Sequence, residues 1–363
     1  MAIAFPTNEP HLSGYFAPLH AECDAPNLPV TGEVPAGLRG TYYRNGPNPQ
    51  FAPRGKYHWF SGDGMLHAFH FDEGRVSYRN RWIRTPKWIM ENENGEGMSG
   101  SLASRHLTDP KLLELNSTVA NTNVVWHGGR LLALEEAHAP FEVDPVSLAP
   151  RPRDGTAADV RWFTGDPCYV FHPMNAFDAP NGSIVCDMMK YDVPPLFPGP
   201  DGRQLSSGAP VASLVRWTFD LSGKSGAYRE QPLCDMPGEF PRLDERFAML
   251  PYRHGYYCSG DISASTKGDS LRSGLAHIDL ATGQVAQYQP PAGDKCGEPV
   301  FVPRHASADE GDGWLLSVIW RAAENRSDMA IFNAQALAAG PVALVHLSHR
   351  VPAGFHGNWR PAG

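Results

Sequence analysis

The chain has 363 residues, of which 42% are hydrophobic, so it is globular and long enough to bury a large core. Its net charge is −8, from 31 Lys and Arg against 39 Asp and Glu, and with no basic run this balance excludes nucleic acid as an expected partner. The 36 Gly and 34 Pro form about a fifth of the chain, a density of turn residues that favours many short strands over long helices.

In chain order, the predicted elements are strands grouped in hairpins. Segments 124–136, 214–228 and 275–289 each hold two strand-like runs around a turn that contains glycine, which is the pattern of a β-hairpin. Further strands are predicted at 311–320, 328–335 and 343–351, with a short helical turn at 334–340 and no longer helical periodicity. Repeated hairpins predict an all-β fold, a β-propeller, whose inner strands can bring ligands from distant parts of the sequence to one axis.

The cysteines and the apolar stretches bear on the compartment. The six cysteines are scattered with no CxxC pair, which favours reduced thiols. The first ten residues have neither a basic nor an apolar signal region, and no stretch approaches the roughly 18 apolar residues of a membrane span. We therefore expect a cytoplasmic protein.

A set of motifs runs almost from one end of the sequence to the other. In order, they are GTYYRNGPNPQF, HWFSGDGMLHAFHF, LLALEEAHAPFEVDP, RWFTGDPCYVFHPMNAFD, EFPRLDERF and GFHGNW. Together they resemble the carotenoid cleavage oxygenases, a family that includes bacterial lignostilbene dioxygenases. The resemblance implies a seven-bladed β-propeller, here incomplete, that holds one Fe(II) by histidine side chains alone. It also implies a non-haem dioxygenase that uses O2 to cleave a conjugated C=C bond into two carbonyl products.

The resemblance also implies the residues of the iron site. His172 in FHPMNAFD and His356 in GFHGNW match the third and fourth of the family's four histidine ligands. Glu136 and Glu239 match two of the glutamates that accept the second ring N–H of a ligand and so fix its orientation. The third such position falls near 213–214, where the chain has no Glu. Neutral imidazoles suit Fe(II) and leave coordination positions open, and no catalytic residue is expected beyond this metal centre.

The family's first two histidines have no counterpart in this chain. They lie in H-P-K-x-D-P and H-D-F stretches, and both stretches are missing between Pro145 and Arg161. The simplest interpretation is one propeller domain over 1–363 that lacks about two blades near 146–160, at about 40–50 residues a blade. A site with two family histidines must complete its coordination shell with water or other ligands, so we expect weak iron binding and little or no cleavage.

Three further histidines are weighed against a structural role. His138 lies two residues beyond Glu136, and on one strand the two side chains would share a face. It is a candidate replacement ligand, although its surroundings favour ordinary scaffold. His67 and His70 are three residues apart, which on a strand places them on opposite faces and prevents them from chelating one metal. A structural role is the prediction for both.

The substrate and the activity leave alternatives open. Glu135 stands where stilbene-cleaving relatives have a Lys that helps hold a phenol oxygen, and an acid there favours an apolar carotenoid or apocarotenoid over a hydroxystilbene. The first hypothesis is therefore an Fe(II)-dependent dioxygenase that acts on an apolar polyene and O2. The alternative is a truncated propeller that is catalytically impaired or inactive. Peripheral membrane contact for substrate uptake and the oligomeric state stay open.

Overall fold

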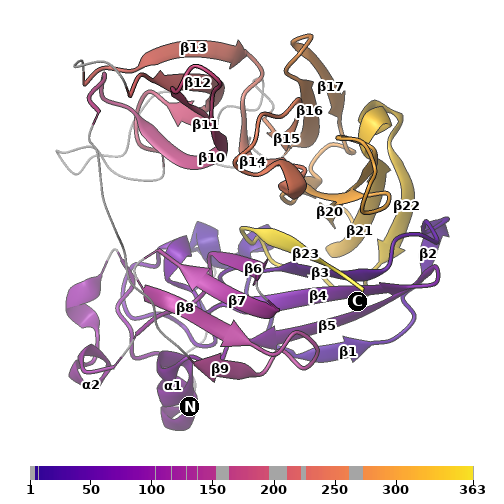
Figure 1. The fold of residues 1–363 in the computed structure, drawn as a ribbon. Helices are drawn as coiled ribbons and strands as arrows, with labels where there is room; N and C mark the ends of the chain where they lie inside the picture. Colours follow the sequence, from indigo (N-terminus) through magenta and orange to yellow (C-terminus); the bar gives the residue numbers. More distant parts are fainter. Residues whose placement is uncertain are drawn as a thin grey trace. The chain divides into compact units, whose positions relative to one another are not determined.

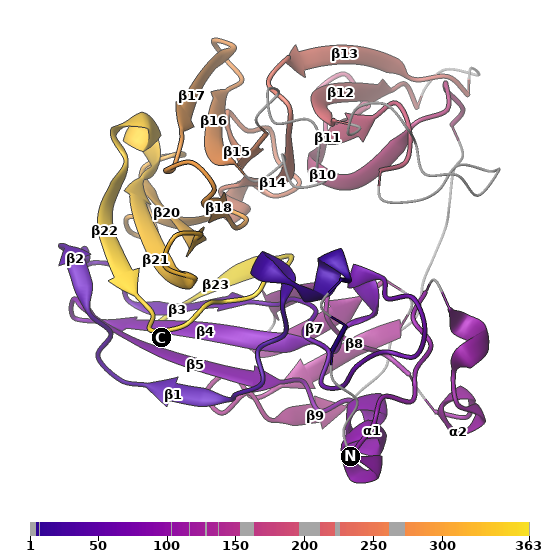
Figure 2. The same ribbon diagram turned by 180° about the vertical axis from the view of Figure 1, so that it is seen from behind.

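The chain divides into two compact units. The structure is a computed structural model that describes residues 5–6, 8–102, 104–115, 117–127, 129–136, 138–152, 163–195, 211–221, 226–260 and 273–362. The first unit comprises Met1–Ala157, Glu324–Asp328 and Val345–Gly363, and the second unit comprises Ala158–Ala323 and Met329–Leu344. Figure 1 labels the elements, and Figure 2 shows the same elements from behind.

The first sheet of the first unit joins strands from both ends of the sequence. Its order is β1-β5-β4-β3-β23, and every pair is antiparallel. The bounds are β1 Cys23–Ala25, β3 Gly40–Arg44, β4 Met65–Asp72, β5 Arg75–Trp82 and β23 Gly357–Pro361. The β4–β5 hairpin turns at Glu73 and Gly74, whose φ values of 48° and 77° are those of a two-residue turn that suits twisted strands.

The second sheet of the first unit confirms the predicted hairpin at 124–136. Its order is β6-β7-β8-β9, with bounds β6 Asn123–His127, β7 Arg130–Glu135, β8 His138–Val143 and β9 Pro150–Pro152. Buried side chains of both sheets, among them Tyr43, Leu66, Val124 and Leu131, form one hydrophobic cluster. The cluster is the core of this unit, because each sheet hides one apolar face against it.

Two α-helices of the first unit were not expected from the sequence. They are α1 Pro86–Asn94 and α2 Pro110–Leu113. The α1 helix is defined by its ends rather than by an apolar stripe: Thr85 accepts a hydrogen bond from the Trp88 backbone N–H, and Gly95 closes the helix with a left-handed φ of 68°. Its buried face carries Lys87 and Glu91 beside Trp88, so the usual hydrophobic period is absent.

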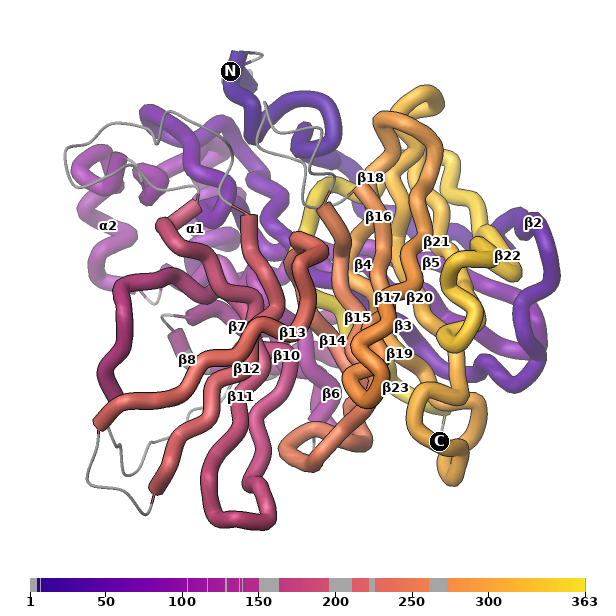
Figure 3. The backbone as a smooth tube through the Cα atoms, turned by 90° about the horizontal axis from the view of Figure 1, so that it is seen from above, coloured from indigo at the N-terminus to yellow at the C-terminus, as the bar shows by residue number. Residues whose placement is uncertain are grey.

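The second unit contains two four-stranded antiparallel sheets and most of a third sheet (Figure 3). The first two are β10 Tyr169–Asp178, β11 Ile184–Tyr191, β12 Ser213–Phe219 and β13 Arg229–Cys234, then β14 Gly238–Leu243, β15 His254–Ser259, β16 Gly274–Asp279 and β17 Gln284–Tyr288. The third is β18 Lys295–Cys296, β20 Gly313–Arg321, β21 Arg326–Asn333 and β22 Pro341–His346, with β19 Val300–Pro303 beside β20. The end of β22 belongs to the first unit, where β2 Val30–Gly32 adds an edge strand.

Short 3-10 helices connect several strands. They are η1 Pro10–Leu12, η2 Gly14–Phe16, η3 Trp59–Ser61, η4 Arg105–Leu107, η5 Glu245–Phe247 and η8 Ala334–Ala339. The last confirms the helical turn expected at 334–340. None of the helices in the described ranges is long and apolar enough to cross a membrane.

The all-β propeller class expected from the sequence is confirmed, in an incomplete form. The described residues form five sheets. Three of them consist of four consecutive strands each, as propeller blades do: β6–β9, β10–β13 and β14–β17. A fourth follows the same order through β20, β21 and β22 and has added strands at its edges. The predicted deletion point near 146–160 falls largely at 153–162, which lies outside the described residues. The deletion therefore stays a prediction.

A pair of histidines in the second unit makes stability depend on pH. His254 Nδ1 and His277 Nε2 are 3.0 Å apart across β15 and β16. Burial, together with the neighbouring His254, lowers the pKa of His277 from 6.5 to about 4. Between these values the unfolded chain binds a proton that the folded chain does not, so stability falls as pH drops below about 6.5.

Replacing His277 with Gln is expected to reduce this acid sensitivity. The substitution removes the titrating group, so the loss of unfolding free energy between pH 7.5 and 4.5 should shrink by about 2–3 kcal/mol. Urea unfolding at the two pH values measures the difference. His305→Gln, at an exposed histidine of the same unit, is the control and should behave as the unsubstituted chain does. Equal acid sensitivity of His277→Gln and the unsubstituted chain would contradict the assignment.

Candidate metal centre

His172 and Glu239 are brought together within the second unit, although 67 residues separate them in the sequence. His172 Nδ1 lies 2.5 Å from Glu239 Oε2. The Glu239 side chain is 3% exposed and that of His172 is 23% exposed. The glutamate is therefore a buried acceptor that holds a more accessible imidazole.

Irregular strand pairing determines the directions of the His172 and Glu239 side chains. His172 lies on β10 where the pairing with β11 shifts between Val170 and Pro173, and Glu239 lies on β14 where the pairing with β15 shifts before Arg242. Such shifts turn side chains away from the regular alternation and are frequent beside functional sites. Phe240 follows with a φ of 56°, a left-handed conformation that a side chain with a Cβ adopts only under strain.

The ring of His172 is also held by stacking. Its centroid lies 5.1 Å from that of Phe240, with an angle of 29° between the planes, and 5.9 Å from that of Phe171. The Phe240 backbone N–H donates to Glu239 Oε2 at 2.7 Å, which orients the carboxylate in turn. Ring position and hydrogen-bonding tautomer are thus both determined by the residues around His172.

This arrangement fits a metal ligand. A carboxylate that accepts the Nδ1–H of a histidine fixes the neutral tautomer that ligates through Nε2, and it makes the imidazole more basic. Glu239 Oε1 is buried without a hydrogen-bond partner. A cation held by His172 would help to compensate this buried polar atom. Glu239 therefore contacts a histidine that was predicted as a ligand, and the roles of both residues at a metal stay predictions.

His356, the other predicted ligand, lies in the first unit just before β23. The residue is 9% exposed. Its backbone carbonyl accepts from the Asn45 N–H at 2.9 Å, and its own N–H donates to the Thr122 carbonyl at 3.3 Å. These bonds fix the backbone position of His356 between two segments of the unit. Its role as a ligand stays a prediction.

The other predicted glutamate is placed differently from Glu239. Glu136 is exposed, and its Oε2 accepts from the Thr122 hydroxyl at 3.1 Å. The carboxylate that contacts a histidine here is that of Glu135, whose Oε1 lies 2.9 Å from His138 Nδ1. The expectation that Glu136 and His138 share a face of one strand is wrong, because the chain turns between β7 and β8 and pairs Glu135 with His138.

The pair in the HAFH segment follows the expectation. On β4, His67 is buried and His70 is exposed, so the two side chains point to opposite faces of the sheet. In the ranges that the structure describes, no three His, Cys, Asp or Glu side chains are grouped so that they could hold a metal ion. His172 and Glu239 are therefore one histidine with a buried carboxylate beside it, and their part in a metal site stays a prediction.

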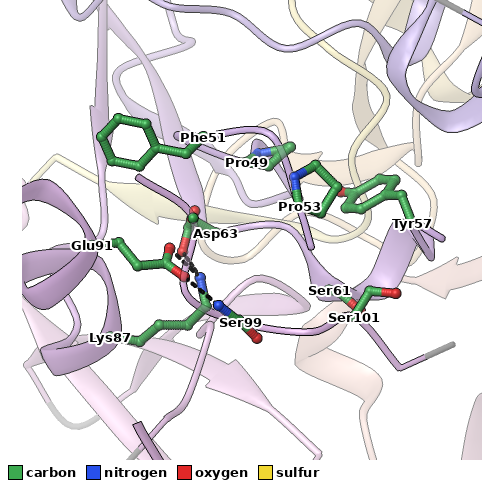
Figure 4. A pocket seen from close by; sticks show the side chains of 11 residues that line it. Pro49, Phe51, Pro53, Tyr57, Ser61, Asp63, Lys87, Glu91, Ser99 and Ser101 are labelled. Atoms are coloured by element: carbon green, nitrogen blue, oxygen red, sulfur yellow. Dashed lines mark hydrogen bonds and ion pairs between the residues drawn. The ribbon is translucent and has the colours of Figure 1, made fainter. Parts of the chain in front are cut away.

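A pocket of the first unit lies beside a buried ionic cluster that the sequence did not reveal (Figure 4). Lys87 on α1 contacts Asp63 Oδ1 at 2.7 Å and Glu91 Oε2 at 2.8 Å, and all three side chains are at most 5% exposed. The wall of the pocket includes Phe51 and Tyr57. None of the predicted iron ligands lines it.

A second ionic group lies next to Glu239 in the second unit. Arg242, also on β14, donates to Glu298 Oε2 at 2.7 Å, and Glu298 is 1% exposed. Burial alone would lower the pKa of Arg242, but the Glu298 and Glu245 carboxylates more than offset it, so the guanidinium stays charged. In the sequence, the EFPRLD motif that contains Arg242 indicated this region, but it did not indicate that Glu298 takes part.

Comparisons with known proteins match this chain along almost all of its length. The family profile described as retinal pigment epithelial membrane protein, RPE65, matches residues 16–156 and 149–361. An isoeugenol monooxygenase of Pseudomonas putida is 27% identical over an alignment of 482 residues that covers 98% of this chain and 99% of that protein. A carotenoid cleavage oxygenase of Mycobacterium tuberculosis is 27% identical over 521 residues, covering 99% of each.

The structural comparison agrees with the sequence matches. The crystal structure of a Pseudomonas brassicacearum lignostilbene dioxygenase superposes with a TM-score of 0.89 at 26% identity, covering 99% of this chain and 100% of that chain. The profile spans far more than half of this chain, and the relatives match it from end to end. The chain therefore belongs to the RPE65 family, the family of the carotenoid cleavage oxygenases.

Proposed function

We propose that this chain is an Fe(II)-dependent oxygenase that cleaves a conjugated C=C bond of an apolar polyene, a carotenoid or apocarotenoid, into carbonyl products. Family membership makes it an oxidoreductase that incorporates O2, and oxidative C=C cleavage is the reaction of the family. The iron, the ligands and the substrate are the proposed parts. The observation that carries the proposal is the His172 pair with buried Glu239.

In this proposal His172 donates through Nε2, and Glu239 holds its Nδ1–H. His356 is the second proposed donor, and Glu136 the second proposed outer-sphere carboxylate. The iron, when bound, supplies the redox chemistry that O2 needs to react with an alkene. The His172 ring contacts the rings of Phe171 and Phe240, and aromatic surfaces of this kind also suit an apolar substrate.

Glu135 supports an apolar substrate over a phenolic one. Its Oε2 accepts from the Thr118 hydroxyl at 2.7 Å and from the Val119 N–H at 3.1 Å, while its Oε1 faces His138. Both oxygens are thus engaged by the protein. A carboxylate in these contacts offers no positive charge to a phenolate, so selectivity for hydroxystilbenes has no support at this position.

The alternative, a catalytically impaired propeller, is favoured by the missing pair of family histidines. The 482-residue alignment with the isoeugenol monooxygenase exceeds the 363 residues of this chain, so at least 119 aligned positions have no residue here. The family profile also matches in two pieces that meet at 149–156. Both observations support an internal deletion, and 119 positions correspond to between two and three blades at about 40–50 residues a blade.

Fe(II) titration under anaerobic conditions, followed by product analysis under O2, tests the proposal. We expect up to one Fe(II) per chain, bound more weakly than a four-histidine site binds it, and carbonyl products labelled from ¹⁸O2 with an apocarotenoid. His172→Ala and His356→Ala should each lose most of the iron. The matched controls His305→Ala and His127→Ala, at exposed histidines of the second and first units, should keep it.

The two hypotheses give different results in this experiment. Iron that binds, depends on His172 and supports O2-dependent cleavage favours the oxygenase. Iron that binds without any product from apocarotenoids or stilbenes favours the impaired propeller. Iron binding that is unchanged in both His172→Ala and His356→Ala would refute the proposed ligands.

A further inference from the structure

Thr31, His346 and Asp328 form a line of contacts within the first unit. The Thr31 hydroxyl oxygen lies 2.8 Å from His346 Nε2, and His346 Nδ1 lies 2.6 Å from Asp328 Oδ1. The three residues are far apart in the sequence but belong to one compact unit. A hydroxyl, an imidazole and a carboxylate in this order are the parts of an activated nucleophile.

Three neighbouring strands of one sheet bring these side chains together. Thr31 lies on β2, His346 is the last residue of β22 and Asp328 lies on β21, and these strands are neighbours in the order β21-β22-β2 (Figure 1). The His346 backbone N–H donates to the Pro29 carbonyl at 2.8 Å, which holds the start of β2 against the end of β22. Strand pairing therefore fixes the backbone positions from which the three side chains meet.

The carboxylate determines which nitrogen of His346 can accept a proton. Asp328 is 1% exposed, and an ionised carboxylate only accepts hydrogen bonds, so His346 Nδ1 is the donor in their contact. In the neutral imidazole the lone pair then lies on Nε2, the nitrogen that faces Thr31. The Thr31 hydroxyl therefore donates to His346, which is the direction that a nucleophile and its general base require.

Arg326 holds the carboxylate from its other side. Its Nη1 donates to Asp328 Oδ1, and the same nitrogen lies 3.2 Å from His346 Nδ1. The Arg326 Nε donates in turn to Glu324 Oε2 at 2.5 Å. The position of Asp328 is therefore fixed by an ion pair as well as by the contact with His346, and the carboxylate can orient the imidazole.

The hydroxyl of this group is accessible from solvent. Thr31 and the other two residues of β2 are exposed, and the His346 side chain is 25% exposed. In the described part of the sheet β2 is an edge strand, so no further strand lies beyond it. A small reagent can therefore reach the Thr31 hydroxyl at the surface without entering a cavity.

A second threonine–histidine contact in the same unit lacks these properties. Thr41 Oγ1 lies 3.0 Å from His70 Nδ1, but Thr41 is 5% exposed. Among the described residues no carboxylate contacts His70. A hydrogen bond between a threonine and a histidine is thus not sufficient for activation, and only Thr31 combines it with an oriented base and access to solvent.

We propose that Thr31 is a nucleophile for small activated acyl esters, with His346 as its general base and Asp328 as the residue that positions His346. The Thr31 oxygen forms a bond to the acyl carbon while its proton passes to His346 Nε2. The bond between the acyl carbon and the alcohol oxygen of the donor breaks, and the alcohol leaves with that proton. Thr31 becomes an ester, and the step requires neither iron nor O2, so it is independent of the proposed oxygenase activity.

Incubation of the unsubstituted chain with p-nitrophenyl acetate, followed by peptide mapping in a mass spectrometer, tests the proposal. We expect Thr31 to be acetylated about 10²–10⁴-fold faster than Thr282, an exposed threonine with no histidine among its described contacts. The rate at Thr31 should level off with rising pH once the imidazole is neutral, whereas an unassisted hydroxyl continues to gain rate. Equal rates at the two threonines would overturn the proposal.

Variants distinguish a general base from a structural histidine. His346→Gln and Asp328→Asn should each lower the rate at Thr31 and remove its levelling with pH, while the rate at Thr282 stays the same. Thr31→Ser should retain the acetylation, and Thr31→Val should lose it. His70→Gln, at the other threonine–histidine contact, is the matched control and should leave the rate at Thr31 unchanged. An unchanged rate in His346→Gln would contradict the proposal, and the comparison within the unsubstituted chain decides it even if Asp328→Asn fails to fold.

Discussion

Replacing Lys87 with Met is expected to lower the free energy of unfolding by about 3–5 kcal/mol, because it leaves two buried carboxylates without their counter-ion. Asp63 and Glu91 are each 3% exposed at the side chain, and Lys87 contacts both. Glu91 Oε1 also accepts the backbone N–H groups of Met98 and Ser99 at 2.9 Å, so the cluster fixes the chain beyond α1. Its loss should therefore loosen the region around the pocket.

The effect should be independent of pH across the neutral range. Burial by itself would lower the pKa of Lys87, but the Asp63 and Glu91 carboxylates raise it above the ordinary value of 10.5. A raised pKa means that the stabilisation is complete below about pH 10.5 and is lost only as pH rises through the folded-state value. Urea unfolding at pH 6 and pH 8 should give the same difference between Lys87→Met and the unsubstituted chain.

Two further variants separate the charge from the packing. Lys56→Met, at an exposed lysine of the same unit, is the control and should change stability by less than about 0.5 kcal/mol. The triple variant Lys87→Met, Asp63→Asn, Glu91→Gln removes the unpaired charges and should recover part of the loss. If Lys87→Met costs no more than the control, the cluster does not stabilise the fold.

Replacing Glu239 with Gln is expected to weaken Fe(II) binding about 10–100-fold, since partners of ligating histidines have effects of this size. The glutamate fixes the tautomer of His172 through a 2.5 Å contact and carries the negative charge that an imidazole–metal unit needs. An amide is nearly the same size but is neutral. The fold should therefore be retained while the metal affinity falls.

Anaerobic titration with Fe(II), and with Co(II) as a spectroscopic substitute, measures this affinity. Glu230→Gln, at an exposed glutamate of the second unit, is the matched control and should bind metal as the unsubstituted chain does. The Tm of Glu239→Gln without metal reports any structural loss separately. Unchanged affinity in Glu239→Gln would show that this carboxylate does not orient a ligand.

The strands were predictable where a glycine in the sequence marks the turn between two of them. The hairpin of β16 and β17 turns at Gly283, with a φ of 73°, and the predicted segment 275–289 contains both strands. The α1 helix was missed because its buried positions include Lys87 and Glu91, which a search for apolar periodicity discards. The features of the sequence that indicate this helix are its caps, Thr85 at the N-terminus and Gly95 at the C-terminus.

The candidate site was predictable only through motifs. His172 and Glu239 meet across two sheets, and neither spacing nor composition indicates a contact over 67 residues. The family resemblance supplied both residues, but it did not pair them with each other. The resemblance did not reveal the turn between β7 and β8. The assumption of one continuous strand therefore placed Glu136 and His138 on the same face, whereas the structure pairs Glu135 with His138. Local geometry at a tight reversal depends on a register that only the folded sheet sets.

The pairing of β23 with β3 has a consequence for biosynthesis. All five residues of β3 are buried, yet until residues 357–361 leave the ribosome this strand is an unpaired edge rich in aromatic side chains. At about 5–20 residues per second, the interval is roughly 15–60 s. An exposed aromatic edge is prone to pairing with other chains. Slow synthesis or high expression should therefore favour aggregation of nascent chains, and chaperones that shield this strand should raise the yield.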